Sequence, residues 1–307
     1  MCSSDLFPSH DKHQGVDCHD EDKGAGDIGI MFGGATLEAP DYTGHSHYIA
    51  KVLSKGLHDL VVQGENIWGR PDIKTQVSIR YEDKIPVAVD NVVICISHAE
   101  DKDLEEIREE ITIYVKEVLA DYNHSIIQLG RQFLDIQNVK VLVNPTGRFA
   151  IFGPASDAGE VGRKIVVDQM GGHFSVGGGN LNGKDATKVD RSGVYISRSA
   201  AKHIVASGLA TKAQVQVSYA IGVAKPTSVC VETFGTSKVD EGLIEEKIKE
   251  LVDFRPGAII NKFKLNKPSS ERGFLYSDLG AYGHIGTVGI NVPWEEVDDR
   301  LIELLKF

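Results

Sequence analysis

Apolar side chains recur at helical spacing in two long segments of the chain. The first runs from Ser46 to Val62 and places one apolar face opposite a polar one. The second runs from Leu104 to Leu119 and repeats its apolar residues every four positions after Asp103, a residue type that favours the N-cap. The repeating residues are Ile107, Ile111, Val115 and Leu119. Both patterns predict amphipathic helices that bury one face.

Alternating apolar and polar residues predict strands, and their order repeats. The predicted strands are 77–81, 86–97, 140–144, 213–223 and 228–234, and further helices are expected at 192–208 and 243–252. Two strands are thus followed by a helix at 77–119 and again at 215–252. This repetition predicts an α+β fold of similar units, each packing helices on one face of an antiparallel sheet.

The composition is that of an acidic globular protein. Of 307 residues, 33 are basic and 44 are acidic, which gives a net charge of −11. This balance argues against nucleic acid or an anionic membrane as the main partner. No apolar run is long enough for a membrane span, and the polar N-terminus resembles no secretory signal. The four cysteines are too widely spread for a zinc site or a disulfide framework, which favours reduced thiols and a cytoplasmic location.

The segment 144–191 is dense in glycine and in charged residues. Within it, GGNLNGK (178–184) approaches the phosphate-loop pattern, but Asp185 stands where a Ser or Thr would hold Mg²⁺, so a true P-loop is not expected. Glycines still let backbone N–H groups approach an anion closely. Four cations accompany them: Arg163, Lys164, Lys184 and Lys188. A polyphosphate site is the favoured interpretation, and a solvated basic face is the alternative.

Carboxylates and one aromatic ring complete this candidate site. Asp157, Asp185 and Asp190 lie among the cations, where Mg²⁺ could bridge a carboxylate and a phosphate, although each could simply pair with Lys or Arg. Phe149 follows Gly147 and Arg148 and could stack on a base, although such a ring is more often part of the core.

Long blocks of the sequence resemble S-adenosylmethionine synthetases. They are GAGDIGIMFGGAT (24–36), RPDIKTQV (70–77), NPTGRFAIFGP (144–154), GRKIVVDQMGG (162–172), GGGNLNGKDATKVDRS (177–192), QVSYAIGVAKPTS (216–228), FRPG (254–257), AYGHIG (281–286) and VPWE (292–295). The likeness runs in order from about Gln14 to Trp294, which is nearly the whole chain.

The resemblance implies a methionine adenosyltransferase, which makes S-adenosylmethionine from ATP and L-methionine and hydrolyses the bound tripolyphosphate to phosphate and diphosphate. It implies Mg²⁺, K⁺ and an active site between the subunits of a dimer. It also implies repeated α+β domains about a pseudo-threefold axis. We expect a flexible active-site loop (1–23), a first α+β unit that lends a strand or helix to the C-terminal unit (24–149), a remnant of an incomplete central domain with the phosphate site (150–191) and a C-terminal α+β unit (192–307).

Site residues follow from the same resemblance, position by position. Lys184, Arg163 and Lys164 match triphosphate or nucleotide positions, and Asp27 matches an active-site residue contributed across the dimer. The remaining matches are Asp72, Lys74, Arg148, Phe149 and Asn180 to ATP, Asp157 to both substrates, Lys188 to the methionine carboxylate and Asp190 to Mg²⁺. Three positions depart from the family's usual residues: Ile28 replaces Gln, Gly34 replaces Tyr and Asn180 replaces Ala.

The sequence does not match the family's opening segment, which carries a catalytic His, an Asp for Mg²⁺ and a Glu for K⁺. His10 is a weak candidate to replace that His. We therefore expect an unpaired sheet edge within 150–190, and either a homo-oligomer or a hetero-oligomer with a chain that supplies the segment. The favoured function is the transferase; the alternative is a non-catalytic partner of a full-length synthetase.

Overall fold

The computed structural model describes residues 22–66, 68–267, 274–286 and 289–306. They form two compact units, one made of the described residues within 1–37 and 161–307 and the other of those within 38–160. We call them the split unit and the continuous unit. The expected loop at 1–23, with His10, lies almost wholly outside the described residues.

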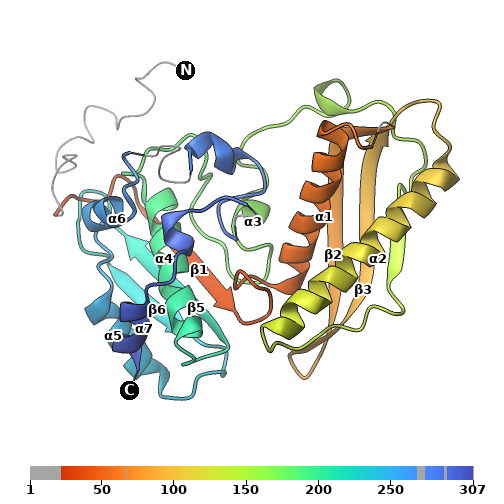
Figure 1. Ribbon diagram of the computed structural model, residues 1–307. Coiled ribbons are helices and arrows are strands. Elements are labelled where there is room, and N and C mark those ends of the chain that lie inside the picture. Colours follow the sequence, from red (N-terminus) through yellow and green to blue (C-terminus); the bar gives the residue numbers. More distant parts are fainter. Residues whose placement is uncertain (1–21, 67, 268–273, 287–288, 307) are drawn as a thin grey trace. The chain divides into compact units, whose positions relative to one another are not determined.

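The continuous unit packs two helices on one face of a three-stranded sheet. Its elements are α1 (His45–Val62), β2 (Gly69–Glu82), β3 (Ile85–His98), α2 (Leu104–Gln128), β4 (Lys140–Val143) and the 3₁₀ turn η3 (Gly153–Ala155). Strands β2 and β3 pair antiparallel, and β4 joins β3 in parallel. One buried cluster contains Ile49 of α1, Ile94 of β3 and Ile111 of α2, so both helices cover the same face of the sheet (Figure 1).

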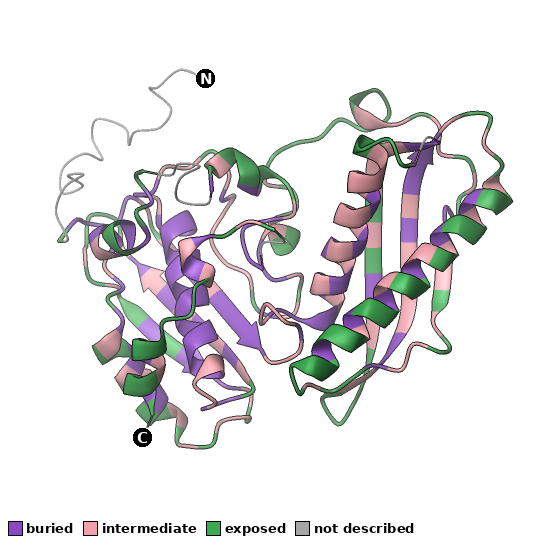
Figure 2. Cartoon of the chain, viewed as in Figure 1, coloured by how far each residue is buried: buried purple, intermediate pink, exposed green. Residues whose placement is uncertain are grey.

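The split unit packs helices against a second three-stranded sheet. Its elements are β1 (Gly29–Thr36), α3 (Ile165–Asp168), α4 (Val189–Ala206), β5 (Lys212–Tyr219), β6 (Ser228–Glu232), α5 (Glu241–Leu251), α6 (Pro256–Phe263), η5 (Tyr276–Gly280), η6 (Pro293–Glu295) and α7 (Asp299–Leu305). The strand order is β1-β5-β6, and both pairings are antiparallel. Helix α4 packs on β1 and β5 and is buried from Val189 to Val205 (Figure 2).

Strand β1 owes its glycines to close packing. A Cβ at Gly33 would lie 2.0 Å from the backbone nitrogen of Arg198 in α4, and one at Gly34 would lie 2.2 Å from the ring of Phe174. The amide of Gly34 also donates to the sulfur of Met170. At Gly33 and Gly34 the strand therefore contacts its neighbours with its backbone alone. These glycines interrupt the alternation of apolar and polar side chains that would have predicted a strand.

The predicted α+β class and the strand–strand–helix repeat are confirmed in β2-β3-α2 and β5-β6-α5. The sheet edge expected within 150–190 is wrong. That segment, all of it described, contains only η3, α3 and the start of α4, and many of its glycines have positive φ. Such backbone forms turns rather than a ladder of hydrogen bonds. The pseudo-threefold axis and the four-part division of the chain stay predictions.

No helix in the described part of the chain is both long and apolar enough to cross a membrane.

Candidate functional site

In the continuous unit, Asp72 joins two segments that the sequence placed in the nucleotide site. Asp72 lies on β2, where its backbone exchanges hydrogen bonds with the Ser97 hydroxyl on β3, both of 3.1 Å. Its carboxylate Oδ2 accepts a hydrogen bond from the amide of Gly153, also 3.1 Å. The amide of Asp157 in turn donates to the carbonyl of Gly153 at 3.0 Å. Strand β2 and the turn that carries Asp157 are thus tied together.

His98 fixes the backbone of Phe149, a role that the sequence did not indicate. Nε2 of His98 accepts from the amide of Phe149, and the amide of His98 donates to the carbonyl of Phe149, each at 3.0 Å. Nδ1 lies 2.8 Å from the carbonyl of Ala99. Since Nε2 accepts and Nδ1 donates, this ring is a neutral Nδ1–H tautomer. In the sequence, His98 is marked only by its place at the end of a strand, three residues after Cys95, and nothing there indicates that it binds the backbone of Phe149.

The other expected residues of this unit have exposed side chains. Lys74 is exposed on β2, opposite Cys95 of β3. Arg148 forms an ion pair of 3.1 Å with Glu100, and both side chains are more than half exposed. Such a pair contributes little stability. Both cations can therefore move onto a ligand at small cost.

In the split unit, Lys184 and Asp190 form the centre of the glycine-rich loop. Lys184 Nζ lies 2.7 Å from Asp190 Oδ2, and the amide of Gly179 donates to Asp190 Oδ1 at 2.6 Å. Asp190 occupies the first turn of α4, where the helix dipole favours a carboxylate. Gly178 has a φ of +72°, and a Cβ there would lie 3.0 Å from Asp190 Oδ1. Glycine is thus required for the loop to fold around the carboxylate.

Lys188 follows the glycine-rich loop, and the backbone before Asp27 is hydrogen-bonded to the same segment. Lys188 Nζ lies 3.9 Å from Asp185 Oδ2, while Asp185 also accepts from the amide of Thr187 at 2.8 Å. The amide of Gly26, the residue before Asp27, donates to the carbonyl of Thr187, the residue before Lys188, at 3.1 Å. A Cβ at Gly26 would lie 2.7 Å from that carbonyl oxygen, which is why the position is a glycine.

Arg163 and Lys164 are exposed and flank the loop through Gly162. A Cβ at Gly162 would lie 2.8 Å from Cβ of Asn180, so the two segments touch. Asn180 uses both ends of its amide on its own loop: Nδ2 donates to the carbonyl of Asn182 at 3.0 Å, and Oδ1 accepts from its amide at 3.1 Å. This places Arg163, Lys164 and Lys184 around one glycine-rich loop.

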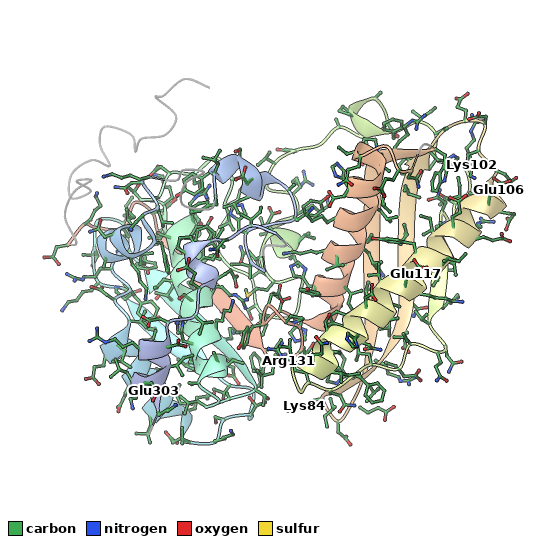
Figure 3. All side chains as sticks on the ribbon, in the orientation of Figure 1. Lys84, Lys102, Glu106, Glu117, Arg131 and Glu303 are labelled. Carbon is green, nitrogen blue, oxygen red and sulfur yellow. The ribbon has the colours of Figure 1, made fainter. Side chains whose placement is uncertain are left out.

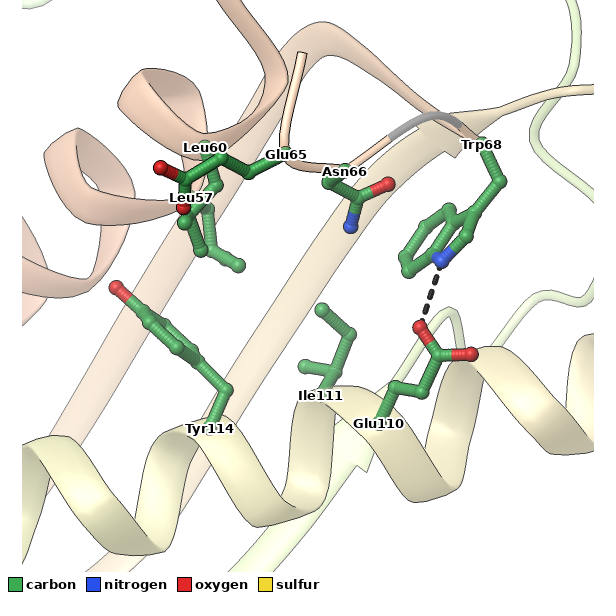
Figure 4. A pocket seen from close by; sticks show the side chains of 8 residues that line it. All are labelled: Leu57, Leu60, Glu65, Asn66, Trp68, Glu110, Ile111 and Tyr114. Carbon is green, nitrogen blue, oxygen red and sulfur yellow. Dashed lines mark hydrogen bonds between the residues drawn. The ribbon is translucent and has the colours of Figure 1, made fainter. Parts of the chain in front are cut away.

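A separate hollow exists in the continuous unit, between α1 and α2 (Figure 4). It encloses about 390 Å³ and contains a hydrogen bond of 2.6 Å from the indole of Trp68 to Glu110. At its edge, Lys102 pairs with Glu106 at 2.7 Å and with Glu110 at 2.8 Å (Figure 3). None of the expected site residues lines this hollow.

Family models match almost the whole chain. Residues 22–149 match the central domain of S-adenosylmethionine synthetase, and residues 151–296 match its C-terminal domain. The chain belongs to the S-adenosylmethionine synthetase family.

Relatives from distant organisms agree with this membership. An S-adenosylmethionine synthase of Rippkaea orientalis is 43% identical over 96% of this chain and 71% of its own length. One from Mycobacterium marinum is 46% identical over 90% of this chain and 66% of its own length. A solved S-adenosylmethionine synthetase from Campylobacter jejuni superposes with a TM-score of 0.81 at 36% identity, over 91% of this chain and 71% of the other. This family member thus corresponds to roughly two thirds of each relative.

Proposed function

We propose that this synthetase-family chain is a methionine adenosyltransferase that joins ATP and L-methionine into S-adenosylmethionine and releases phosphate and diphosphate. The observation that carries the proposal is the glycine-rich loop, in which Lys184 Nζ lies 2.7 Å from Asp190 Oδ2. The segment with Arg163 and Lys164 touches this loop where Gly162 meets Asn180. Family membership favours this activity over a non-catalytic partner.

The first step is displacement at carbon. A lone pair of the methionine sulfur forms a bond to C5′ of ATP, the C5′–O bond breaks, and the triphosphate leaves with that electron pair. The product is a sulfonium cation. Since about four negative charges leave together, catalysis requires positioning and cations around the departing chain. Lys184, Arg163 and Lys164 are the residues that we assign to this task. Hydrolysis of the tripolyphosphate then consumes one water.

The Lys184–Asp190 ion pair must exchange partners when substrate binds. Lys184 would turn from Asp190 to phosphate oxygens, and the carboxylate would then need another cation. Asp190 suits Mg²⁺, which usually takes one or two protein carboxylates together with substrate phosphates. Among the described residues, no group of three or more His, Cys, Asp or Glu could hold a metal ion. Bound Mg²⁺ would neutralise charge on the phosphate oxygens. The family also uses K⁺, for which we assign no ligand here.

The remaining residues would hold the two substrates. We assign Asp72, Lys74 and Arg148 to ATP, with the half-buried ring of Phe149 near the adenine. Asp157 would contact both ATP and methionine. Lys188 would face the methionine carboxylate, and Asp27 would act in the neighbouring subunit's site.

We further propose that copies of the chain associate through the sheet of the split unit. Helix α4 covers one face, and the other carries Ile30, which is 49% exposed, and the half-buried Phe32. Phe32 pairs with Gln216, which pairs with the exposed Cys230, so this side is continuous across three strands. Beyond Ile30 and Phe32 this side is mostly polar, and the segment at Phe174 and Gly177 packs over part of β1, so the exposed Ile30 is the apolar group that we assign to the interface. Ile30→Asp should lower the molar mass measured by light scattering, and an unchanged mass would exclude this face.

The free thiols of Cys95 and Cys230 fit a reducing cytoplasm, which is the location we propose.

The test of the activity is formation of S-adenosylmethionine by the purified protein with Mg²⁺ and K⁺. Lys184→Ala should lower kcat by at least about a hundredfold, because one cation is removed from the leaving group. The matched control is Lys55→Ala, which also breaks a lysine–aspartate pair, of 2.6 Å, but in the continuous unit and not in the glycine-rich loop. The assay includes an arm in which the N-terminal third of a relative is co-expressed. Equal turnover in Lys184→Ala and wild type would refute the assignment, and no turnover in either arm would refute the activity.

A further inference from the structure

A chain of buried hydrogen bonds links helix α4 to the glycine-rich loop through the AYGHIG motif. Arg191 donates from a guanidinium nitrogen to the hydroxyl of Tyr195 at 2.9 Å, and that hydroxyl lies 2.7 Å from Nδ1 of His284. Nε2 of His284 lies 3.0 Å from Oδ1 of Asn182, at the turn before Lys184. Arg191, Tyr195 and His284 are all nearly or wholly buried, so the two bonds of Tyr195 are shielded from water, while the bond to Asn182 is partly buried.

Only one arrangement of protons satisfies every member of this chain. Arg191 can only donate, so the oxygen of Tyr195 accepts from it and the single phenolic proton points to Nδ1 of His284. Burial raises the pKa of Tyr195, which keeps that proton in place. Nδ1 of His284 is then the acceptor, and the Nε2–H group donates to Asn182. His284 is thus a neutral Nε2–H tautomer, the opposite of the tautomer at His98.

Arg191 also bonds directly to the other end of the turn. Its Nε donates to the carbonyl of Lys184 at 3.0 Å, while His284 holds the side chain of Asn182 two residues earlier. Gly183, between these two points, has a φ of +77°. The turn that presents Lys184 is therefore held from both ends by buried groups.

The same turn is coupled to the second cationic segment. Asn180 and Asn182 exchange two hydrogen bonds, and Cβ of Asn180 packs against Gly162, which precedes Arg163 and Lys164. Asn180 replaces the alanine usual in the family, so the two hydrogen bonds to Asn182 are an addition within this loop, while the Cβ contact with Gly162 would be kept by alanine.

His284, which holds the turn, is itself held in place by several contacts. The ring of Trp294 stacks on Tyr195 at 3.6 Å between centroids, and its indole donates to the carbonyl of His284 at 2.8 Å. The amide of His284 donates to the carbonyl of Asp168 at 2.7 Å, which ties the motif to α3. His284 therefore has little freedom to follow a moving loop.

We propose that His284 is a positioning residue, which with Arg191 and Tyr195 holds the Asn182–Lys184 turn in the shape that presents Lys184 to a polyphosphate. The ordering of the turn stands on the geometry alone, and its consequence for polyphosphate rests on the proposed function. Preorganisation of this kind lowers the cost of ordering the loop when the ligand binds.

The decisive measurement is amide hydrogen exchange of the full chain, read on peptides that cover 178–188. His284→Ala should speed exchange there by about tenfold, the equivalent of about 1.4 kcal/mol for a lost hydrogen bond. The matched control is His203→Ala, because His203 is also a buried histidine with two partners, the carbonyl of Ser199 and the amide of Asp298. It should loosen the split unit without a selective effect on the loop.

A second pair of variants guards against misfolding of His284→Ala. Asn182→Ala removes the acceptor and should also speed exchange in 178–188, while Asn182→Asp keeps an acceptor for the His284 N–H and should restore protection. Wild-type exchange in both His284→Ala and Asn182→Ala would overturn the proposal. Equal acceleration by His203→Ala would also overturn it, since the effect would then be general loosening.

Calorimetric titration with inorganic tripolyphosphate tests the functional consequence. We expect His284→Ala to weaken binding by about tenfold and His203→Ala to leave it within about twofold of wild type. If wild type fails to bind tripolyphosphate, the proposed function fails, and the exchange experiment still decides the positioning role. If His284→Ala binds as tightly as wild type despite a loosened turn, the turn does not preorganise the site and the proposal falls.

Discussion

Helices α2 and α4 use opposite designs, one in each unit. Helix α2 buries a single stripe that includes Ile107, Ile111 and Val115 and exposes the rest. Helix α4 is buried on all sides although it carries charged residues, among them Arg198 with no exposed surface and Lys202 (Figure 2). The stripe of α2 needs only an apolar sheet beneath it, whereas the buried cations of α4 need a counter-charge.

The partner of those charges is a single carboxylate from the VPWE motif. Glu295 accepts from Arg198 Nε at 2.9 Å and from the other guanidinium branch at 2.8 Å, and from Lys202 Nζ at 2.9 Å. It also accepts from the amide of Gly286 at 3.0 Å. The comparison teaches that α4 depends on one distant residue, while the stability of α2 is spread over many contacts.

Removing that carboxylate should have the largest effect on stability. Glu295→Ala leaves two buried cations without their counter-charge, and we expect a loss of about 3–5 kcal/mol in the free energy of unfolding. Urea unfolding followed by circular dichroism measures it. A loss below about 1 kcal/mol would contradict the dependence of α4 on Glu295.

A cavity under α2 should cost somewhat less. Ile111→Ala removes a side chain that is 2% exposed, and a loss of about 3 kcal/mol is expected from transfer and cavity terms. Ile113→Ala, whose side chain is 58% exposed on the same helix, is the matched control and should change stability by less than about 0.5 kcal/mol. Similar losses in both variants would show that α2 does not bury a single stripe.

Acid should remove the stabilising contribution of Glu295 to α4. Burial alone would raise the pKa of Glu295, but the charges of Arg198 and Lys202 outweigh it and lower the pKa to about 2. The folded pKa lies below that of an unfolded Glu, so this contribution is present above about pH 4.5 and is lost as pH falls toward 2. At pH 4 we expect a loss of about 1 kcal/mol from this group. Stability measured between pH 7 and 4 in wild type and Glu295→Gln should diverge by that amount, and parallel curves would contradict it.

The smallest expected effect concerns the start of α2. The carboxylate of Asp103 accepts from the amides of Glu105 at 2.9 Å and Glu106 at 3.1 Å, as an N-cap does. Asp103→Ala should cost about 0.5–1 kcal/mol, measured by urea unfolding. Asp103→Asn, which retains an acceptor, should recover most of it, and a failure to recover would remove capping as the cause.

The same contrast explains what the sequence could predict. Helix α2 and its cap at Asp103 follow from four-residue spacing, although the helix continues to Gln128, beyond the predicted end at Leu119. Helix α4 was expected from Ser192 but begins at Val189, because a helix buried all round has no polar face to mark its limits. Strand β1 was not predicted, since Gly33 and Gly34 serve close packing rather than alternation.

The site shows a similar division. The cations and carboxylates of 157–190 could be proposed from the sequence because their residue types carry the chemistry. The pairing of Lys184 with Asp190 is a matter of three-dimensional contact, as is the support from His98 and His284. A histidine in a motif has no sequence feature that tells a buried positioning group from a catalytic one.

The contact between Gly34 and Phe174 makes the residue types at two distant positions of the sequence depend on each other. The ring of Phe174 occupies the space that any side chain at Gly34 would enter, 2.2 Å from a Cβ there. The Tyr that is usual in the family at this position would collide with that ring. The two positions therefore constrain each other, because a side chain at position 34 requires a smaller one than Phe at position 174.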